Sequence, residues 1–303
     1  ISRKFGEKTK LSLIASAFHT NEQERYDIQG QYWLTQTETS ENLGVGTYME
    51  HARNYLKATV KSIKFALEHK TKKHDIQAGL TYRIENITED SKEYEMRDSS
   101  GYSIPHTGED LYMIYSLKAK NTLDANRLET YIQDTWRFSS KGEHTFFTLN
   151  YGIRFSHWNF NKESIISPRI SLGIVPAFNH DVTMRFATGI YYQAPFYKEL
   201  RDTTTINGIT YATLNNKIKS QRSIHFIAGF DYRFKMKDRP YKFTAEAYYK
   251  ALSNLVPYTV DNVKIVYDAS QQCSGHAMGL DLKLYGEFVP GTDSWVSLSL
   301  MTT

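Results

Sequence analysis

The chain has almost no cysteine, because Cys273 is its single thiol in 303 residues. An internal disulfide and a zinc site built from several cysteines are therefore excluded. The chain also lacks any run of about 18 apolar residues, which excludes a bundle of membrane-spanning helices. Neither charge dominates, since 37 Lys and Arg stand against 33 Asp and Glu. A net charge of +4 spread over so many groups does not form the basic stripe of a nucleic-acid-binding protein.

Sequence signatures of enzyme chemistry are missing as well. No Gly-x-Ser-x-Gly nucleophile motif occurs, and the ten histidines include no His-Glu-x-x-His pair. Carboxylates in residues 89–98 could bind calcium, but Lys92 and Arg97 lie among them, which favours a solvated segment. We therefore predict no catalytic residue, no metal site and no cofactor, and expect that the protein is not an enzyme.

Two-residue alternation of apolar and polar side chains is the pattern that the chain has in abundance. Residues 76–85 alternate without a break, so that apolar and polar side chains project from opposite faces of an extended strand. Strands in globular domains usually span about 5–6 residues, whereas a tilted strand needs roughly 9–11 to cross a bilayer. The same alternation recurs in residues 128–138, 147–155, 182–190, 224–234, 243–250 and 278–284.

Alternation alone leaves two surroundings open. A soluble β-domain turns its polar face outward, whereas an outer-membrane barrel turns its apolar face outward and encloses a polar lumen. The mean hydropathy of −0.53 is compatible with a barrel, because only every second strand residue faces lipid. Aromatic residues make up 14% of the chain and cluster at strand ends, as in Trp136, Phe138 and Trp295, which is typical of the girdles at bilayer interfaces. Stacked aromatic residues in a soluble β-domain are the alternative.

The lengths of the connections favour the barrel. Short turns are predicted at residues 70–74, 139–144, 178–181, 235–240 and 290–293, and long polar connections at residues 20–53, 86–126, 194–221 and 251–274. Outer-membrane barrels have short periplasmic turns and longer extracellular loops. The sequence therefore predicts an all-β fold, a transmembrane up-and-down antiparallel β-barrel, with about eleven spans between residues 10–18 and 295–301. Bacterial barrels have even strand numbers and no open edge in lipid, so we expect an internal piece of a longer barrel, truncated at both ends.

Two positions depart from the pattern. The apolar phase switches between even and odd positions at residues 60–63, which predicts a β-bulge. Asp134 lies on the apolar face of its strand, where a charge facing lipid is costly. We expect Asp134 to lie near a rim of the barrel or to be redirected.

One stretch resembles the middle of the barrel of TonB-dependent outer-membrane receptors. It is Ser167-Pro168-Arg169-Ile170-Ser171-Leu172-Gly173, followed by a turn and a strand that leads into Ala194-Pro195-Phe196. Supporting marks in matching order are Tyr131-Ile132-Gln133-Asp134, Gly152-Ile153-Arg154-Phe155, Ala247-Tyr248-Tyr249-Lys250 and Gly279-Leu280-Asp281-Leu282, and the loops resemble those of receptors from Bacteroidetes. The resemblance implies that residues 1–303 are a portion of a barrel of about 22 strands, and that the plug domain is not present in this chain.

The resemblance also implies a function. It is an outer-membrane receptor of a Gram-negative bacterium that imports a scarce nutrient, such as a siderophore, vitamin, haem or oligosaccharide. The implied partners are the TonB energy-transducing complex acting through the plug, the small-molecule or oligosaccharide ligand, a surface lipoprotein and the lipid bilayer. Two other classes stay open: a passive outer-membrane channel, and a secreted carbohydrate-binding β-domain. The predicted contacts with substrate or plug are Tyr32, Trp33, Arg169, Arg185, Pro195 and Phe196.

Overall fold

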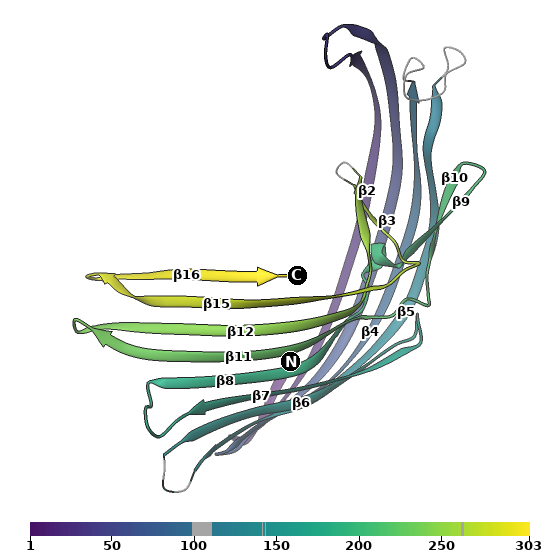
Figure 1. The fold of residues 1–303 in the computed structure, drawn as a ribbon. Coiled ribbons are helices and arrows are strands. Elements are labelled where there is room, and N and C mark those ends of the chain that lie inside the picture. The colour runs from purple at the N-terminus through teal and green to yellow at the C-terminus, as the bar shows by residue number, and fades with distance from the viewer. Residues whose placement is uncertain (99–110, 141, 143, 262–263) are drawn as a thin grey trace.

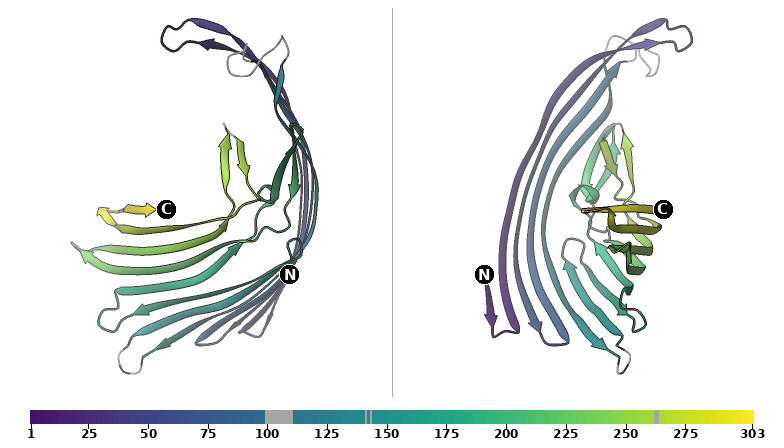
Figure 2. Two further views of the ribbon diagram at one scale, coloured as in Figure 1. Left: turned by 45° about the vertical axis from the view of Figure 1, so that its right-hand side comes forward. Right: turned by 90° about the vertical axis from the view of Figure 1, so that its left-hand side faces the viewer.

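One curved antiparallel sheet forms most of the computed structural model (Figure 1). The structure describes residues 1–98, 111–140, 142, 144–261 and 264–303, without the side chains of residues 34 and 42–44. The sheet curls into a trough that stays open between its two edge strands, as Figure 2 shows from two further directions. The all-β, up-and-down barrel wall predicted from the sequence is therefore confirmed, as a partial barrel.

The long strands of the wall follow one another in chain order. In the described part of the chain they are β2 (Thr9–Thr35), β3 (Asn42–Lys70), β4 (His74–Asp98), β5 (Tyr112–Ser139), β6 (Phe146–Trp158), β7 (Glu163–Val175), β8 (Val182–Gln193), β11 (Gln221–Met236), β12 (Arg239–Leu255), β15 (Cys273–Val289) and β16 (Thr292–Thr302). The short β1 (Ser2–Phe5) pairs with β2 at one edge. These strands match the eleven predicted spans, because every predicted short turn joins two of them.

Smaller elements lie in two of the long connections. Between β8 and β11 are η1 (Tyr197–Leu200), β9 (Arg201–Ile206) and β10 (Ile209–Leu214). Between β12 and β15, β13 (Tyr258–Asp261) and β14 (Lys264–Tyr267) form a separate hairpin. Among the described residues, none of the helical segments is long and apolar enough to cross a bilayer.

The prediction of long connections at residues 20–53 and 86–126 was wrong for most of their length. β2 to β5 contain 25–29 residues each, and the turn between β2 and β3 occupies only residues 36–41. In these upper segments the outward face becomes mostly polar, and the concave face mixes charged residues with apolar ones such as Leu117, Leu123 and Ala125 of β5. The outward apolar stripe of the membrane spans therefore ends while the backbone ladder continues. Part of the second predicted connection, residues 99–110, lies outside the described residues.

The predicted bulge at residues 60–63 was also wrong. Val60 pairs with Phe18 on one side and with Glu85 on the other, and no register shift occurs there in either ladder. The phase switch has a different cause. Even-numbered positions of β3 face the concave side throughout. Along the chain the outward side changes from polar at Lys61 to apolar at Ile63, while the concave side changes from apolar at Val60 to polar at Ser62.

Asp134 lies near the short-turn end of the wall, where β4 begins. Its Oδ2 lies 2.6 Å from Nδ1 of His74 and accepts a hydrogen bond of 3.0 Å from the Tyr151 hydroxyl. The Asp134 side chain is only 10% exposed, because these two side chains cover it on the outward face. The expectation of a rim position is confirmed.

The upper part of β5 would be an open edge without help from a distant segment. β6 ends where Trp158 pairs with Arg127, although β5 continues upward to Tyr112. β10 pairs with this free edge in parallel, with Thr210 opposite Leu117 and Ala212 opposite Ala119. The pairing satisfies backbone groups that would otherwise be open to another chain.

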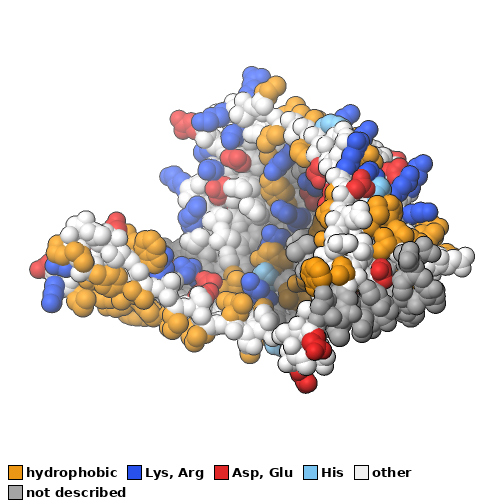
Figure 3. Space-filling model, turned by 90° about the horizontal axis from the view of Figure 1, so that it is seen from above, with side chains coloured by type: hydrophobic (Ala, Val, Ile, Leu, Met, Phe, Trp, Pro, Cys, Tyr) orange, Lys and Arg blue, Asp and Glu red, His pale blue; other side chains and the backbone are white. Residues whose placement is uncertain are grey.

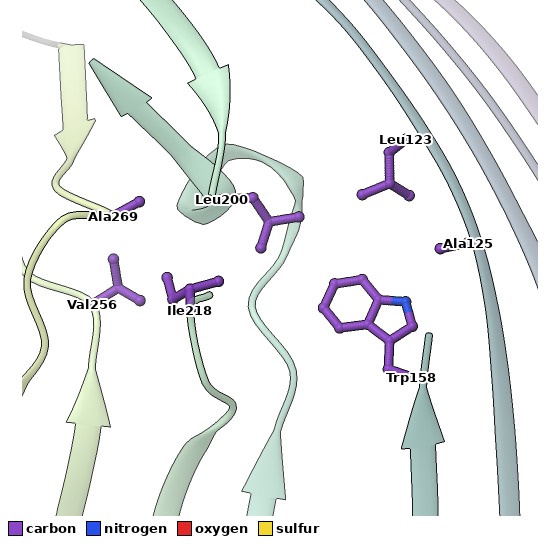
Figure 4. Packing of buried hydrophobic residues seen from close by; sticks show 7 residues of the cluster. All are labelled: Leu123, Ala125, Trp158, Leu200, Ile218, Val256 and Ala269. Atoms are coloured by element: carbon purple, nitrogen blue, oxygen red, sulfur yellow. The ribbon is translucent and has the colours of Figure 1, made fainter. Parts of the chain in front are cut away.

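A small hydrophobic core holds this connection against the wall (Figure 4). Its buried residues come from β5, β6 and the two folded connections, and they are Leu123, Ala125, Trp158, Leu200, Ile218, Val256 and Ala269. Leu200 is only 1% exposed. The connection after β8 is therefore a packed cap on the inner side of the wall rather than a free loop.

Candidate functional site

The two faces of the wall differ in chemistry. Outward side chains of the middle strands are large, apolar and uncovered: Leu80 is 42% exposed, Ile132 54% and Phe226 54%. No second sheet packs on them in the described part of the chain. Seen from above, hydrophobic side chains lie along the outside of the wall and basic side chains line the trough (Figure 3). We therefore take the concave face as the candidate site.

One row of directly paired positions crosses the middle of the concave face. Arg169 on β7 pairs with Gly152 on β6 and with Gly189 on β8. Gly189 in turn pairs with His225 on β11, which pairs with Lys250 on β12. The row places three basic or titratable side chains from strands far apart in the sequence on one level of the wall.

Tyrosine rings contact all three of these side chains. The Arg169 guanidinium carbon lies 4.2 Å from the centroid of the Tyr191 ring, and His225 stacks on the same tyrosine at 4.3 Å. The Lys250 ammonium lies 4.9 Å from the ring of Tyr248.

Tyr131 plays the same part on β5, between Lys64 at 5.8 Å and Arg154 at 5.9 Å. Such contacts attract a cation to the face of the ring without neutralising it. We call the set the basic belt, and its members are Lys64, Tyr131, Arg154, Arg169, Tyr191, His225, Tyr248 and Lys250.

Glycines make room for the belt. A Cβ atom at Gly189 would lie 3.0 Å from Cγ of Arg169, and a Cβ at Gly79 would collide with the ring of Tyr131. A hollow of about 310 Å³ on the concave face has Tyr131, Arg154 and Arg169 in its lining. Alanine at either glycine would force a belt side chain to move.

The cations of the belt differ in their partners from the other cations of the concave face. Among the described residues, Lys64, Arg154, Arg169 and Lys250 form no ion pair, and the Arg169 Nε is buried without a hydrogen-bond acceptor. A level closer to the short turns is different. There Arg185 donates to Asp231 at 2.6 Å and lies 3.8 Å from Glu246, and Lys242 lies 3.3 Å from Asp231.

A buried carboxylate stands above the belt, beneath the cap. Glu89 is 7% exposed, accepts hydrogen bonds from the Tyr197 hydroxyl at 2.9 Å and from Asn121 at 3.0 Å, and lies 3.4 Å from Arg201. Burial, and next the Glu89 charge, raises the pKa of Tyr197. Burial and the nearby Glu93 similarly raise the pKa of Tyr115 to about 12.

The calcium alternative for residues 89–98 gains no support from this arrangement. Glu89 points inward among hydroxyl, amide and guanidinium groups. No group of three or more candidate metal ligands gathers in the part of the chain that the structure describes.

The residues predicted to contact substrate or plug fall into four places. Arg169 belongs to the basic belt, and Arg185 lies on the neighbouring strand in the ion-paired level. Pro195 is buried, and Phe196 packs edge-on against Tyr267 at 5.1 Å in the cap. Their contacts with substrate or plug stay predictions.

Tyr32 and Trp33 lie far from these, near the upper end of β2. The Tyr32 hydroxyl donates to the Asp98 carbonyl at 2.9 Å, whereas Trp33 is 69% exposed. The structure does not bring them to the belt, and their proposed contact with a ligand also stays a prediction.

The tyrosines of the belt and its cations other than Arg169 were not predicted from the sequence as site residues. Their period-two positions place Tyr131, Arg154 and Tyr248 on the polar face, and this was the available signal. Their convergence depends on the register between strands, which the sequence does not display.

The chain is similar in fold to several solved structures. The chain is similar to the RagAB peptide importer, with a TM-score of 0.55 and 13% identity, covering 99% of this chain and 35% of that one. It is similar to FpvA of P. aeruginosa bound to heterologous pyoverdines, with a TM-score of 0.52 and 10% identity, covering 99% and 39%. For the ferric enterobactin receptor PfeA from Pseudomonas aeruginosa the TM-score is 0.52 at 13% identity, covering 100% and 51%.

At such identities these likenesses show the fold alone. The chain spans between about a third and a half of the length of these three structures. No curated protein matches it in sequence. The model of the TonB dependent receptor-like β-barrel family, however, matches residues 3–302. The chain therefore belongs to the family of TonB-dependent receptor-like β-barrels, which are transport receptors of the Gram-negative outer membrane.

Proposed function

We propose that this chain forms part of the barrel wall of a receptor that imports a scarce nutrient across the outer membrane with energy from TonB. In this proposal residues 1–303 are a portion of the barrel domain, and a plug domain elsewhere in the full-length protein fills the lumen. In this role the wall binds the cargo and guides it, without a chemical step.

The two-faced wall is the observation that carries the proposal. Its outward face keeps large apolar side chains such as Ile132 and Phe226 exposed over the middle strands, which suits contact with lipid. Hollows of about 750 and 710 Å³ on this face have apolar linings that lipid chains would fill. The concave face carries arginine, lysine, glutamine and asparagine, which suits an aqueous passage.

The substrate class of the whole receptor follows from neither face alone. This fold is shared by a peptide importer, a protein bound to pyoverdines and a ferric enterobactin receptor. Fold does not determine cargo. A surface lipoprotein stays a predicted partner, for which co-purification with the tagged full-length receptor is the direct test.

Growth under TonB control tests the proposal. The full-length receptor is expressed in a Gram-negative host deprived of its own receptors, and a panel of ferric siderophores, cobalamin, haem, oligopeptides and oligosaccharides is supplied at limiting concentration. We expect at least one nutrient to restore growth in a TonB-positive host and not in its TonB-negative twin.

The same pair of hosts tests the passive channel. Growth or uptake of equal rate in both hosts would favour diffusion through an open pore and contradict energised import. A folded monomer that stays in solution without detergent would contradict both membrane proposals and favour the carbohydrate-binding β-domain.

A further inference from the structure

The concave face separates its charges by level. Near the short turns, Asp231 and Glu246 are matched by Arg185 and Lys242. On the level of the basic belt, the cations of β3, β6, β7 and β12 have tyrosine rings as neighbours but no carboxylate partner among the described residues. Glu129 lies opposite Ser156 on the same concave side and in the paired row of Lys64. It lines a small hollow with Arg154, Arg169 and Glu163, but neither arginine forms an ion pair with a carboxylate among the described residues.

We propose that the basic belt binds oxyanionic groups of the cargo, such as carboxylates, phosphates or catecholates, through Arg154, Arg169 and Lys250. This inference rests on the proposed function, and it narrows the substrate class to compounds with several negative charges. We expect a neutral cargo of the same size to bind the belt more weakly, because it offers these three cations no charged acceptor.

The surroundings of Arg169 favour an oxyanionic ligand. Its guanidinium carbon lies 4.2 Å from the centroid of the Tyr191 ring, and this contact restricts where the donor fork can lie. Glycines at 152 and 189 flank it on both neighbouring strands, which leaves no side chain to cover it there. Its Nε has no acceptor among the described residues, and a charged donor left unmatched in this way is costly unless an oxyanion from outside them supplies one.

The other cations extend the site along the wall. Lys250 pairs with His225, which stacks on the tyrosine that holds Arg169. Arg154 is exposed and is fixed from below by Tyr131, two positions from Gly152 on β6. A cargo with several oxyanionic groups could therefore engage more than one cation at once, and each charge-assisted hydrogen bond adds to affinity.

Binding of a fluorescent anion tests the inference without any need for transport. The full-length receptor in detergent is titrated with pyrene tetrasulfonate, and fluorescence anisotropy gives the Kd. A pyrene that carries a trimethylammonium group is the cationic counterpart. We expect the anion to bind and the cation to bind far more weakly.

Removal of the cations should abolish this preference. In the triple variant Arg154→Gln, Arg169→Gln and Lys250→Gln, we expect the Kd for the tetrasulfonate to rise by about tenfold for each cation removed. The matched control changes the same number of charges on the outward face above the bilayer, with Lys57→Gln, Lys92→Gln and Lys120→Gln. We expect that control to keep the wild-type Kd, and circular dichroism to report equal strand content in all three proteins.

Two results would overturn the inference. One is a wild-type receptor that does not prefer the anion, and the other is a belt variant with unchanged Kd. If TonB-dependent uptake persists beside either result, import stands and the assignment of the belt falls. If the belt binds anions but no nutrient is taken up under TonB control, the proposed function falls and the anion site stands.

Discussion

The upper segments of β2 to β5 and the shorter strands β6, β7 and β8 belong to one hydrogen-bonded ladder, but their outward faces differ in chemistry. The shorter strands, of 12–13 residues, are close to the length that a bilayer requires, and their outward faces are apolar. The longer strands, of 25–29 residues, continue past that length, and their outward faces become polar. Side-chain alternation therefore reports the solvent on each face, whereas strand continuity depends on the backbone partners.

Packing under the cap should show the largest effect. For Leu200→Ala we expect the free energy of local unfolding of the cap to fall by about 2–5 kcal/mol, because a fully buried side chain leaves a cavity that its neighbours cannot fill. Hydrogen exchange of residues 210–212, which pair with β5, should accelerate accordingly.

The control for this prediction is a leucine of the outward face. Leu280→Ala removes the same atoms from a side chain that is 38% exposed, where lipid can fill the space. A faster exchange of residues 210–212 in Leu280→Ala than in Leu200→Ala would contradict the separate core.

Charge on the outward face distinguishes the two kinds of strand directly. We expect Phe226→Arg to destabilise the folded receptor in lipid by about 2–4 kcal/mol, since this residue lies on a membrane-length strand. Thr88→Arg on the upper part of β4 should cost about 0–1 kcal/mol, because water surrounds that segment. Equilibrium unfolding from vesicles by guanidinium compares the two variants, and equal losses would place both positions in the same surroundings.

A pH effect on the upper segments should be the smallest. Hydrogen bonds from Arg53 and His51 hold the pKa of Asp27 below its ordinary value, and the pKa of Arg53 is raised in turn. Asp27 is charged in the folded state to a lower pH than in the unfolded state. Its contribution is therefore present at neutral pH, begins to fall near the unfolded pKa of about 3.9, and is lost below the folded pKa.

Asp27→Asn should remove that acid-dependent part of the stability. Proteolysis of the β2–β3 tip between neutral and acid pH measures the local stability of the variant and of the wild type. The difference in stability between the two proteins should shrink as the pH falls. A difference that grows with acidity would show that the sign is wrong.

Much of the wall could be predicted from the sequence, and the reasons are physical. An uninterrupted alternation such as residues 76–85 needs two different surroundings on the two faces, and its length excludes most soluble sheets. The upper strands escaped prediction because their outward faces become polar, so the apolar stripe that marks a membrane span ends, and the apolar positions of β5 turn inward to the cap. The phase switch at Val60 was misread for the same reason, since a change of solvent at Lys61 imitates a bulge.

The candidate site was less predictable. The two-residue alternation places Arg169 and Arg185 on the polar face of their strands. It does not show which cations of different strands lie side by side. Arg169 and Lys250 share a level only because the registers of β7, β8, β11 and β12 align them. The difference between an ion-paired arginine and one without a carboxylate partner is a property of that alignment.

The pairing of β10 with β5 has a consequence for the order of assembly. Asn121 donates a hydrogen bond to the carbonyl of Ala212, 91 residues further along the chain. A contact of such long range forms late, because the entropy of closing the intervening segment must be overcome first. During biogenesis the outer rim beside β5 should therefore stay accessible to chaperones and to hydrogen exchange until the segment after β8 has paired with it. Failure of this pairing would leave an unpaired strand edge, prone to aggregation, at the cell surface.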